Sequence, residues 1–255
     1  MSLQLSSLPT VQLATLPAVT AAGMREVDRL ATEDFGISLA QMMELAGMNL
    51  ARTAQHVCSG LTAQKVTVLV GSGGNGGGGL VAARHLANRG AEVQVVLAFP
   101  VRRLRPIAEE RLATMIEMLV PCRVAAWDLL HGELEELLGG SDLLVDALLG
   151  YSADGPPRGP LDELLERAAA SGRPVLSLDL PSGLDPDTGT VAGRALRAAA
   201  TMTIALPKRG LLTPSGRAYS GQLYLADIGL PAALYQRAGL AFADPFGDGP
   251  LARLD

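Results

Sequence analysis

The chain has 255 residues, of which 48% are hydrophobic and 18% are charged, and its formal net charge at pH 7 is −5. This composition is that of a compact globular protein with a sizeable core, and it excludes a disordered chain. The acidic balance, with no basic block beyond Val101–Arg105, argues against nucleic acid as a partner.

Helical patterns come first in the chain and then alternate with short apolar runs. The two opening helices are expected over residues 21–35 and 38–57. There follow a strand at 66–70, a helix at 80–89, a strand at 93–98, a helix at 107–119, a strand at 123–126, a helix at 134–138, a strand at 143–146, a helix at 161–171, and strands at 175–179, 202–206 and, less clearly, 222–226. Strands that are apolar throughout predict a mainly parallel sheet covered on both faces.

No internal repeat or linker divides the chain, so we expect a single three-layer, Rossmann-like α/β domain over residues 1–255. Residues 1–15 lack the basic start of a signal peptide and are expected to form a mobile arm, and residues 240–255 a tail. Two distant cysteines, Cys58 and Cys122, exclude a disulfide framework and favour a cytoplasmic location. No apolar run approaches the roughly 18 residues of a membrane span, so a membrane is not an expected partner.

The segment Gly71–Gly79, directly after the first strand, holds seven glycines. A P-loop is excluded because its Gly-Lys-Ser/Thr ending is absent. The dinucleotide fingerprint GxGxxG is met from Gly71 to Gly76, but the acidic residue about 20 positions later is missing. Arg102 and Arg103 could instead hold a 2′-phosphate, which keeps an NADP-dependent reductase as a minor alternative. The glycines could also serve only a tight turn, although their number exceeds what a turn needs.

Ligands of such sheets bind beyond the carboxyl ends of the strands, where Gly71–Gly79, Asp146, Asp179 and Lys208 are expected. Further motifs follow in order: DALLG at Asp146–Gly150, RGPL at Arg158–Leu161, LDLPSGLDPDTG at Leu178–Gly189, ALPKRGL at Ala205–Leu211 and ADIGLP at Ala226–Pro231.

With the glycine segment and Thr20–Gly47, these motifs closely resemble the YjeF N-terminal domain family, over roughly residues 16–230. The resemblance implies an NAD(P)H-hydrate epimerase. Such an enzyme interconverts the R and S forms of NADHX or NADPHX, nicotinamide cofactors hydrated at C6. A separate dehydratase can then repair both forms.

The resemblance also implies roles for individual residues. Asp179 would be the catalytic acid and base, with Lys208 beside it, and a potassium ion would be held by Asn75, Asp146 and Ser182. The nucleotide would be contacted by Gly73, Gly74, Asn75, Gly76, Gly77, Gly78, Gly150, Tyr151, Ser152 and Asp179. The alternative roles are structural: Asp179 and Asn75 in turns, Asp146 as a helix cap and Lys208 as a solvated strand-end lysine.

The chain departs from the family pattern at several positions. Gly74 and Gly78 stand where the family has Asn and Asp, Leu45 stands in place of another Asn, and Tyr151–Ser152 replaces Thr-Gly. This pattern is typical of a preserved fold with an altered substrate pocket. A non-catalytic nucleotide- or protein-binding module of the same fold is therefore the alternative to the epimerase.

The family also tends to form homodimers. Met42, Met43 and Met48 could supply an apolar contact, and a place in the core is the other interpretation of these methionines.

Overall fold

The computed structural model describes residues 8–129 and 132–255; residues 1–7 of the expected arm lie outside the described part. The strands are β1 (Thr10–Val11), β2 (Lys65–Val70), β3 (Glu92–Leu97), β4 (Cys122–Val124), β5 (Leu143–Ala147), β6 (Val175–Leu178), β7 (Ala200–Ile204), β8 (Gln222–Ala226) and β9 (Leu251–Leu254). The helices are α1 (Ala21–Arg29), α2 (Leu39–Val57), α3 (Gly74–Ala87), α4 (Pro106–Glu117), α5 (Glu133–Gly139), α6 (Pro160–Ala170), α7 (Arg209–Leu212), α8 (Pro214–Ser220) and α9 (Ala232–Arg237), with short helical turns η1 (Leu13–Thr15), η2 (Leu30–Asp34) and η3 (Val101–Arg103).

The described strands form one nine-stranded sheet in the order β1-β9-β8-β7-β6-β5-β2-β3-β4. Within it, the pairing of β8 with β9 is antiparallel and the other pairs are parallel. The chain proceeds from β2 to β3 and β4 on one side and then returns to β5 on the other side of β2. This reversal between β2 and β5 is a topological switch point, where ligands bind in open α/β sheets.

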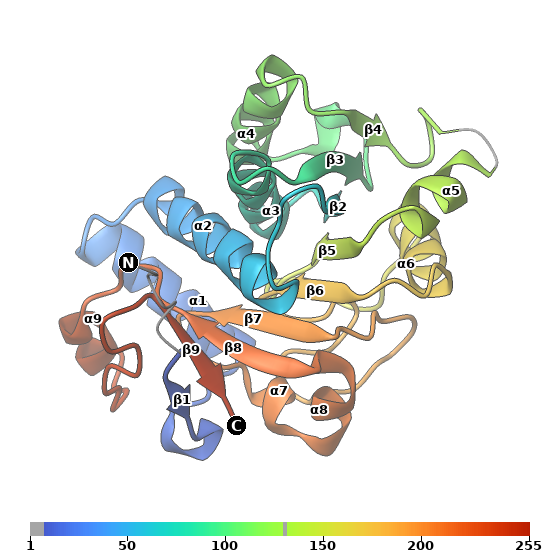
Figure 1. The fold of residues 1–255 in the computed structure, drawn as a ribbon. Helices are drawn as coiled ribbons and strands as arrows, with labels where there is room; N and C mark the ends of the chain where they lie inside the picture. Colours follow the sequence, from blue (N-terminus) through green and yellow to red (C-terminus); the bar gives the residue numbers. More distant parts are fainter. Residues whose placement is uncertain (1–7, 130–131) are drawn as a thin grey trace.

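Helices cover both faces of the sheet (Figure 1). Val68 of β2 packs in a cluster with residues of α2, α3 and α4, whereas its neighbour Leu69 packs in a cluster with residues of α5 and α6. Consecutive strand residues are thus buried on opposite faces, which explains why the strand sequences are apolar throughout. The predicted three-layer α/β fold with a mainly parallel sheet is confirmed.

The helices α1 and α2 each begin directly after a residue whose side chain caps the helix N-terminus. Thr20 accepts a hydrogen bond from the Gly23 N–H, and Ser38 and Gln41 form a reciprocal capping box. The first helical segment, expected over residues 21–35, changes after Arg29 into the π-helical turn η2. No helix among the described residues has the length and apolarity needed to cross a membrane.

Both chain ends differ from expectation. Instead of belonging to a mobile arm over residues 1–15, Thr10–Val11 forms β1, which pairs with β9. Instead of lying in a tail over residues 240–255, Leu251–Leu254 forms β9, which pairs with β8. Strands this short carry little periodicity, and their stability comes from the sheet edge that receives them.

The glycine segment also differs, because α3 begins at Gly74 and not near residue 80. None of the seven glycines has a positive φ, so conformational freedom is not their purpose. A Cβ at Gly71 would clash with the Leu148 carbonyl, one at Gly76 with the Gly71 carbonyl, and one at Gly79 with the Ala147 side chain. The glycines therefore let α3 approach the sheet closely.

The same holds where α3 meets α2. A Cβ at Gly77 would come within 2.6 Å of the Met43 side chain, and Gly47 of α2 lies against Val81 of α3. Gly73 and Gly74 differ, because a Cβ on either would meet nothing within 4 Å. Within the segment, only Gly73 and Gly74 leave space for a further group.

These contacts predict opposite effects of two alanine substitutions in α3. Gly76→Ala should lower the free energy of unfolding by about 1–3 kcal/mol, because the new methyl group overlaps backbone atoms that cannot rotate away. Gly74→Ala should raise it by up to about 1 kcal/mol, since alanine favours a helix where space is free. Urea unfolding of both variants measures the difference, and equal effects would contradict this account of the segment.

Candidate active site

The carboxyl end of β5 carries a buried carboxylate with a complete set of donors. Asp146 is 0% exposed. It accepts hydrogen bonds from the Ser177 hydroxyl at 2.9 Å and from the Ser182 hydroxyl and N–H at 2.6 and 2.8 Å. The Leu148 N–H makes a longer contact of 3.3 Å. Burial raises the pKa of Asp146, and the hydrogen bonds oppose that shift.

Asn75 joins the same cluster from the first turn of α3. Its side-chain amide donates to the carbonyl oxygens of Leu149 at 2.8 Å and Leu178 at 3.2 Å. The Leu149 N–H in turn donates to the Ser182 hydroxyl at 2.9 Å. The peptide groups of Leu149 therefore connect Asn75 with Ser182 and Asp146, so the three residues expected to share an ion do lie together.

The strands β6 and β7, which follow β5 in the sheet, both end in strained turns. The Leu180 N–H bonds the Leu178 carbonyl across Asp179, and the Leu206 N–H bonds the Ile204 carbonyl across Ala205. Asp179 and Ala205 have φ values of 72° and 59°. Such γ-turns are rare, and a residue other than glycine in this region costs on the order of 1–3 kcal/mol. Surrounding contacts must therefore hold Asp179 in place.

The main such contact is an ion pair between the Asp179 Oδ1 and the Lys208 ammonium group. The two side chains are 2% and 0% exposed, so both charges are out of water. Lys208 also donates to the Ile204 carbonyl at 3.0 Å and to the Thr203 hydroxyl at 3.3 Å. The solvated lysine considered as the structural alternative is thus wrong, because this lysine is enclosed. Within the described part of the chain, Lys208 is the only partner of Asp179 Oδ1.

Tyr151, in the loop after β5, contacts both members of the Asp179–Lys208 ion pair. Its N–H donates to Asp179 Oδ2 at 2.9 Å, and its ring centroid lies 5.8 Å from the Lys208 nitrogen. Its hydroxyl donates to the carboxylate of Asp28 on α1. Burial is the main cause that raises the pKa of both Asp28 and Tyr151, and each is also shifted by the charges around it.

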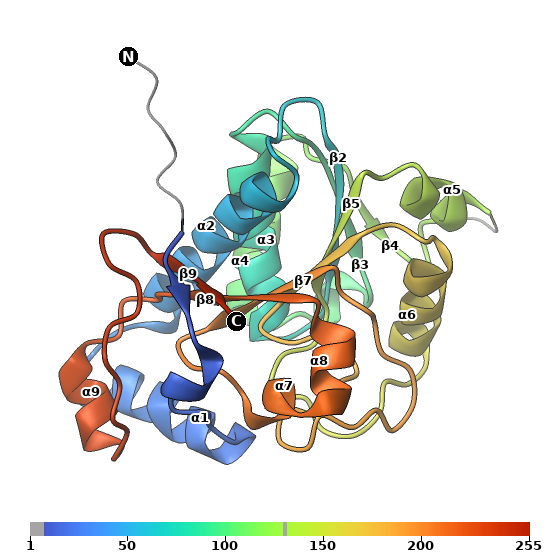
Figure 2. The same cartoon turned by 60° about the horizontal axis from the view of Figure 1, so that its bottom comes forward.

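Asp28 is the site residue that the sequence analysis missed. It lies 123 positions from Tyr151 in the chain. The only sequence feature that could have pointed to Asp28 is its position in the segment Thr20–Gly47, which resembles the family. The helical pattern of that segment assigns no role to the Asp28 carboxylate. Figures 1 and 2 show that α1 lies beside α9, and the two helices share one hydrophobic cluster.

The residues expected to contact the nucleotide differ in their exposure. Gly73, Gly74, Asn75, Gly150 and Tyr151 are partly exposed, Ser152 is exposed, and Gly76, Gly77, Gly78 and Asp179 are buried. A Cβ on Gly150 would lie 3.2 Å from oxygens of both Asn75 and Asp179. The Asn75 and Asp179 clusters are therefore adjacent, with the Gly150 backbone between them.

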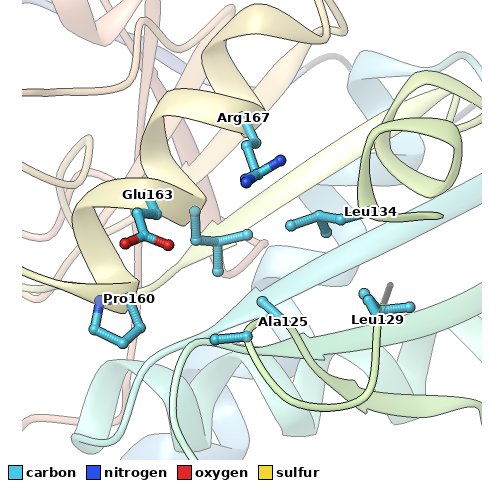
Figure 3. A pocket seen from close by; sticks show the side chains of 8 residues that line it. Ala125, Leu129, Leu134, Pro160, Glu163 and Arg167 are labelled. Atoms are coloured by element: carbon cyan, nitrogen blue, oxygen red, sulfur yellow. The ribbon is translucent and has the colours of Figure 1, made fainter. Parts of the chain in front are cut away.

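Cavity size alone does not identify this site. A cavity of about 80 Å³ borders it and is lined in part by Gly150, Leu180 and Pro181. A larger one, of about 200 Å³, lies between α5 and α6 and is lined in part by Leu134, Glu163 and Arg167 (Figure 3). Arg167 is already paired there with Glu135. We place the candidate site at the strand ends beside the smaller cavity, because the convergent buried polar groups lie at those strand ends.

Met42 and Met43 of α2 are buried, so the core interpretation of these two methionines is correct. Met48 is partly exposed.

The model of the family described as YjeF-related protein N-terminus matches residues 39–210. An NAD(P)H-hydrate epimerase of Dehalogenimonas lykanthroporepellens is 40% identical over 247 residues, which are 96% of each chain. A bifunctional NAD(P)H-hydrate repair enzyme of Salinibacter ruber is 38% identical over 87% of this chain and 42% of its own length. The crystal structure of the yeast protein ynu0 matches with a TM-score of 0.79 and 26% identity, covering 94% of this chain and 100% of that one.

The buried position of Asp28 predicts a pH effect on stability. Because burial raises its folded-state pKa, Asp28 stabilises the fold fully below its unfolded pKa of about 3.9, and this contribution is lost as the pH rises through the folded value. Asn at position 28 still accepts the Tyr151 bond but does not titrate. The unfolding free energy of the wild type minus that of Asp28→Asn should therefore fall with rising pH.

Urea unfolding from pH 4 to pH 8 measures this difference. The charged groups that face Asp28 are Lys208 and Asp179, and they are the same in both proteins. Glu26→Gln, on the same helix, is the control, because Arg29 lowers the pKa of Glu26 and the difference should not fall. A wild-type minus Asp28→Asn difference that rises with pH would show that the carboxylate is not held in a desolvated site.

Proposed function

The chain belongs to the family of proteins related to the YjeF N-terminus, and from this membership we propose that it is an NAD(P)H-hydrate epimerase. The observation that carries the proposal is the buried Asp179–Lys208 ion pair at the ends of neighbouring strands. It supplies a positioned carboxylate beside a switch point, in a chain 40% identical to a relative named for this activity.

Epimerisation at C6 requires the hydroxyl group to leave and return. The ring nitrogen next to C6 donates its electron pair as the C6–O bond breaks, and the departing hydroxyl takes a proton and leaves as water. Water then adds to the opposite face of the planar carbon and gives up a proton. The Asp179–Lys208 ion pair holds one transferable proton, on the ammonium group, which can pass through the carboxylate to the departing hydroxyl and be taken back from the adding water.

Asp179 is the proposed acid and base. Lys208 and the Tyr151 N–H hold one oxygen each, which fixes the direction of the carboxylate. The whole residue Asp179 is only 1% exposed, so the substrate ring reaches it only after neighbouring groups move. Asp28 acts as a positioning residue. It accepts the hydrogen bond of the Tyr151 hydroxyl, and this contact holds the residue whose N–H donates to Asp179.

The Asn and Asp side chains that the family has at positions 74 and 78 are absent from this chain, and the two absences do not support the non-catalytic alternative equally. A Cβ on Gly78 would come within 2.9 Å of the Leu178 side chain, so this position concerns the packing of α3. Gly74 faces open space, so an Asn side chain at this position, as in the family pattern, could reach a ligand.

We further propose that a potassium ion binds among Asn75, Asp146 and Ser182. The support is that the peptide groups of Leu149 link the Asn75 side-chain amide to the Ser182 hydroxyl, which donates to Asp146, and that within the described residues no cationic side chain is paired with Asp146. Asp146 already accepts four hydrogen bonds, so its oxygens would hold the ion, together with those of Asn75 and Ser182, in exchange for one of these bonds. When bound, the ion would supply positive charge near the substrate phosphates.

A homodimer, a cytoplasmic location and a separate dehydratase in the same repair remain predictions. The bifunctional relatives are named for repair of the same hydrates, and this chain spans 42% of the length of the relative from Salinibacter ruber.

The acid and base role predicts that Asp179→Asn lowers the epimerisation rate by at least about 100-fold, the lower limit for general acid–base catalysis. Asn keeps the shape of Asp and tolerates the positive φ of this position, but it leaves the buried Lys208 charge unpaired, so circular dichroism first verifies that the variant is folded. Proton NMR of an unequal R and S NADHX mixture measures the rate. Asp154→Asn, on the exposed part of the loop after β5, is the control. A folded Asp179→Asn protein with wild-type rate would exclude the proposed role.

The cation proposal predicts that potassium stabilises the fold relative to tetramethylammonium at equal ionic strength. At ten times its dissociation constant, the gain is about 1.4 kcal/mol. Thermal unfolding in a potassium titration should show a saturating rise for the wild type and none for Asp146→Asn. Coinciding wild-type curves in the two salts would refute the site, whatever the activity.

A further inference from the structure

Three arginines lie next to the glycine segment without a carboxylate to neutralise them. Arg102 and Arg103 belong to η3, and Arg105 directly precedes α4. All three are exposed. In the described part of the chain none of them takes part in an ion pair. The Arg103 guanidinium lies 4.8 Å from the centroid of the Phe99 ring, which restricts its direction.

Backbone contacts fix this arginine segment against the ligand end of the sheet. β3, from which the segment emerges, is the neighbour of β2. The Ala98 N–H bonds the Val70 carbonyl at 2.9 Å, and the Arg105 N–H bonds the Ser72 carbonyl at 3.0 Å. The arginines therefore border the partly exposed start of the glycine segment, where Gly73 and Gly74 leave open space.

The distance from Asp179 suits a dinucleotide. Asp179 follows β6, and β5 and β2 lie between β6 and β3. Three strand spacings amount to about 14 Å, which an extended dinucleotide spans. With its nicotinamide ring at Asp179, such a molecule crosses the switch point and places its adenosine half beyond β3.

The chemistry after β3 distinguishes the two forms of the cofactor. A carboxylate at this place in a dinucleotide-binding sheet bonds the ribose 2′-hydroxyl, and an arginine accommodates a 2′-phosphate. The stretch from Phe99 to Arg105 contains no acidic residue and three arginines. The planar guanidinium group matches phosphate oxygens in geometry and charge.

We propose, on the basis of the epimerase function above, that Arg102, Arg103 and Arg105 form a subsite for the 2′-phosphate of the substrate. The enzyme accordingly prefers NADPHX to NADHX. The same arginines bind NADP⁺ more tightly than NAD⁺, because the subsite recognises the phosphomonoester and not the nicotinamide ring.

The test compares the double variant Arg102→Ala/Arg103→Ala with a charge-matched control, Arg173→Ala/Arg217→Ala. Arg173 precedes β6, and Arg217 lies on α8. Both are exposed, and neither takes part in an ion pair within the described residues. Calorimetry gives the dissociation constants of NADP⁺ and NAD⁺, and NMR gives KM and kcat for both hydrates. In the double variant, the affinity for NADP⁺ should fall and KM for NADPHX should rise by at least about tenfold. The values for NAD⁺ and NADHX and every kcat should stay within twofold, as should all values of the control.

Other results separate this inference from the proposed function. Epimerisation of both hydrates with equal KM, unchanged in the double variant, would overturn the subsite and leave the epimerase in place. Equal losses for the phosphorylated and unphosphorylated forms would also overturn it, because they would indicate general electrostatic attraction. Binding of NADP⁺ that depends on the arginines, in a protein that epimerises neither hydrate, would support the subsite and contradict the epimerase.

Discussion

The ion pair between Asp179 and Lys208 is the interaction on which the arrangement of the strand ends depends. Removing two charges from water costs several kcal/mol for each ion, and attraction offsets this only when hydrogen bonds complete both groups. The Ile204 carbonyl and Tyr151 N–H supply such bonds. They do so because β6 and β7 both end in γ-turns, which direct Asp179 and the Ile204 carbonyl toward the same buried point. Backbone strain and desolvation are thus concentrated where chemistry is proposed.

A second constraint is the close approach of α3 to the sheet and to α2. It brings Asn75, in the first turn of the helix, within reach of the carbonyl oxygens of Leu149 and Leu178. These two carbonyls belong to the loops that carry Tyr151 and Asp179. Glycines such as Gly76 and Gly79 therefore contribute to the site without touching a ligand, since larger residues would hold Asn75 away from the strand ends.

The fold was largely predictable because its central strands are buried on both faces and its helices begin at ordinary capping residues. Predictions from local sequence patterns were wrong where contacts with distant segments decide the secondary structure. The sequence predicts the helix only from residue 80 because glycine disfavours helices, yet tertiary packing places Gly74–Gly79 in α3. The edge strands β1 and β9 went unrecognised because two to four residues carry too weak a pattern, and the sheet edge supplies their partners.

The sequence by itself determined the parallel α/β fold, its resemblance to the family and the positions of Asn75, Asp146, Asp179, Ser182 and Lys208 at strand ends. Parallel strands bring their carboxyl ends to one edge of a sheet, so order in the chain is enough for that conclusion. Only the tertiary structure decided that Lys208 is buried and paired with Asp179, and that Asp28 reaches the site through Tyr151. Such contacts depend on how distant segments pack, and no periodicity within a single segment encodes them.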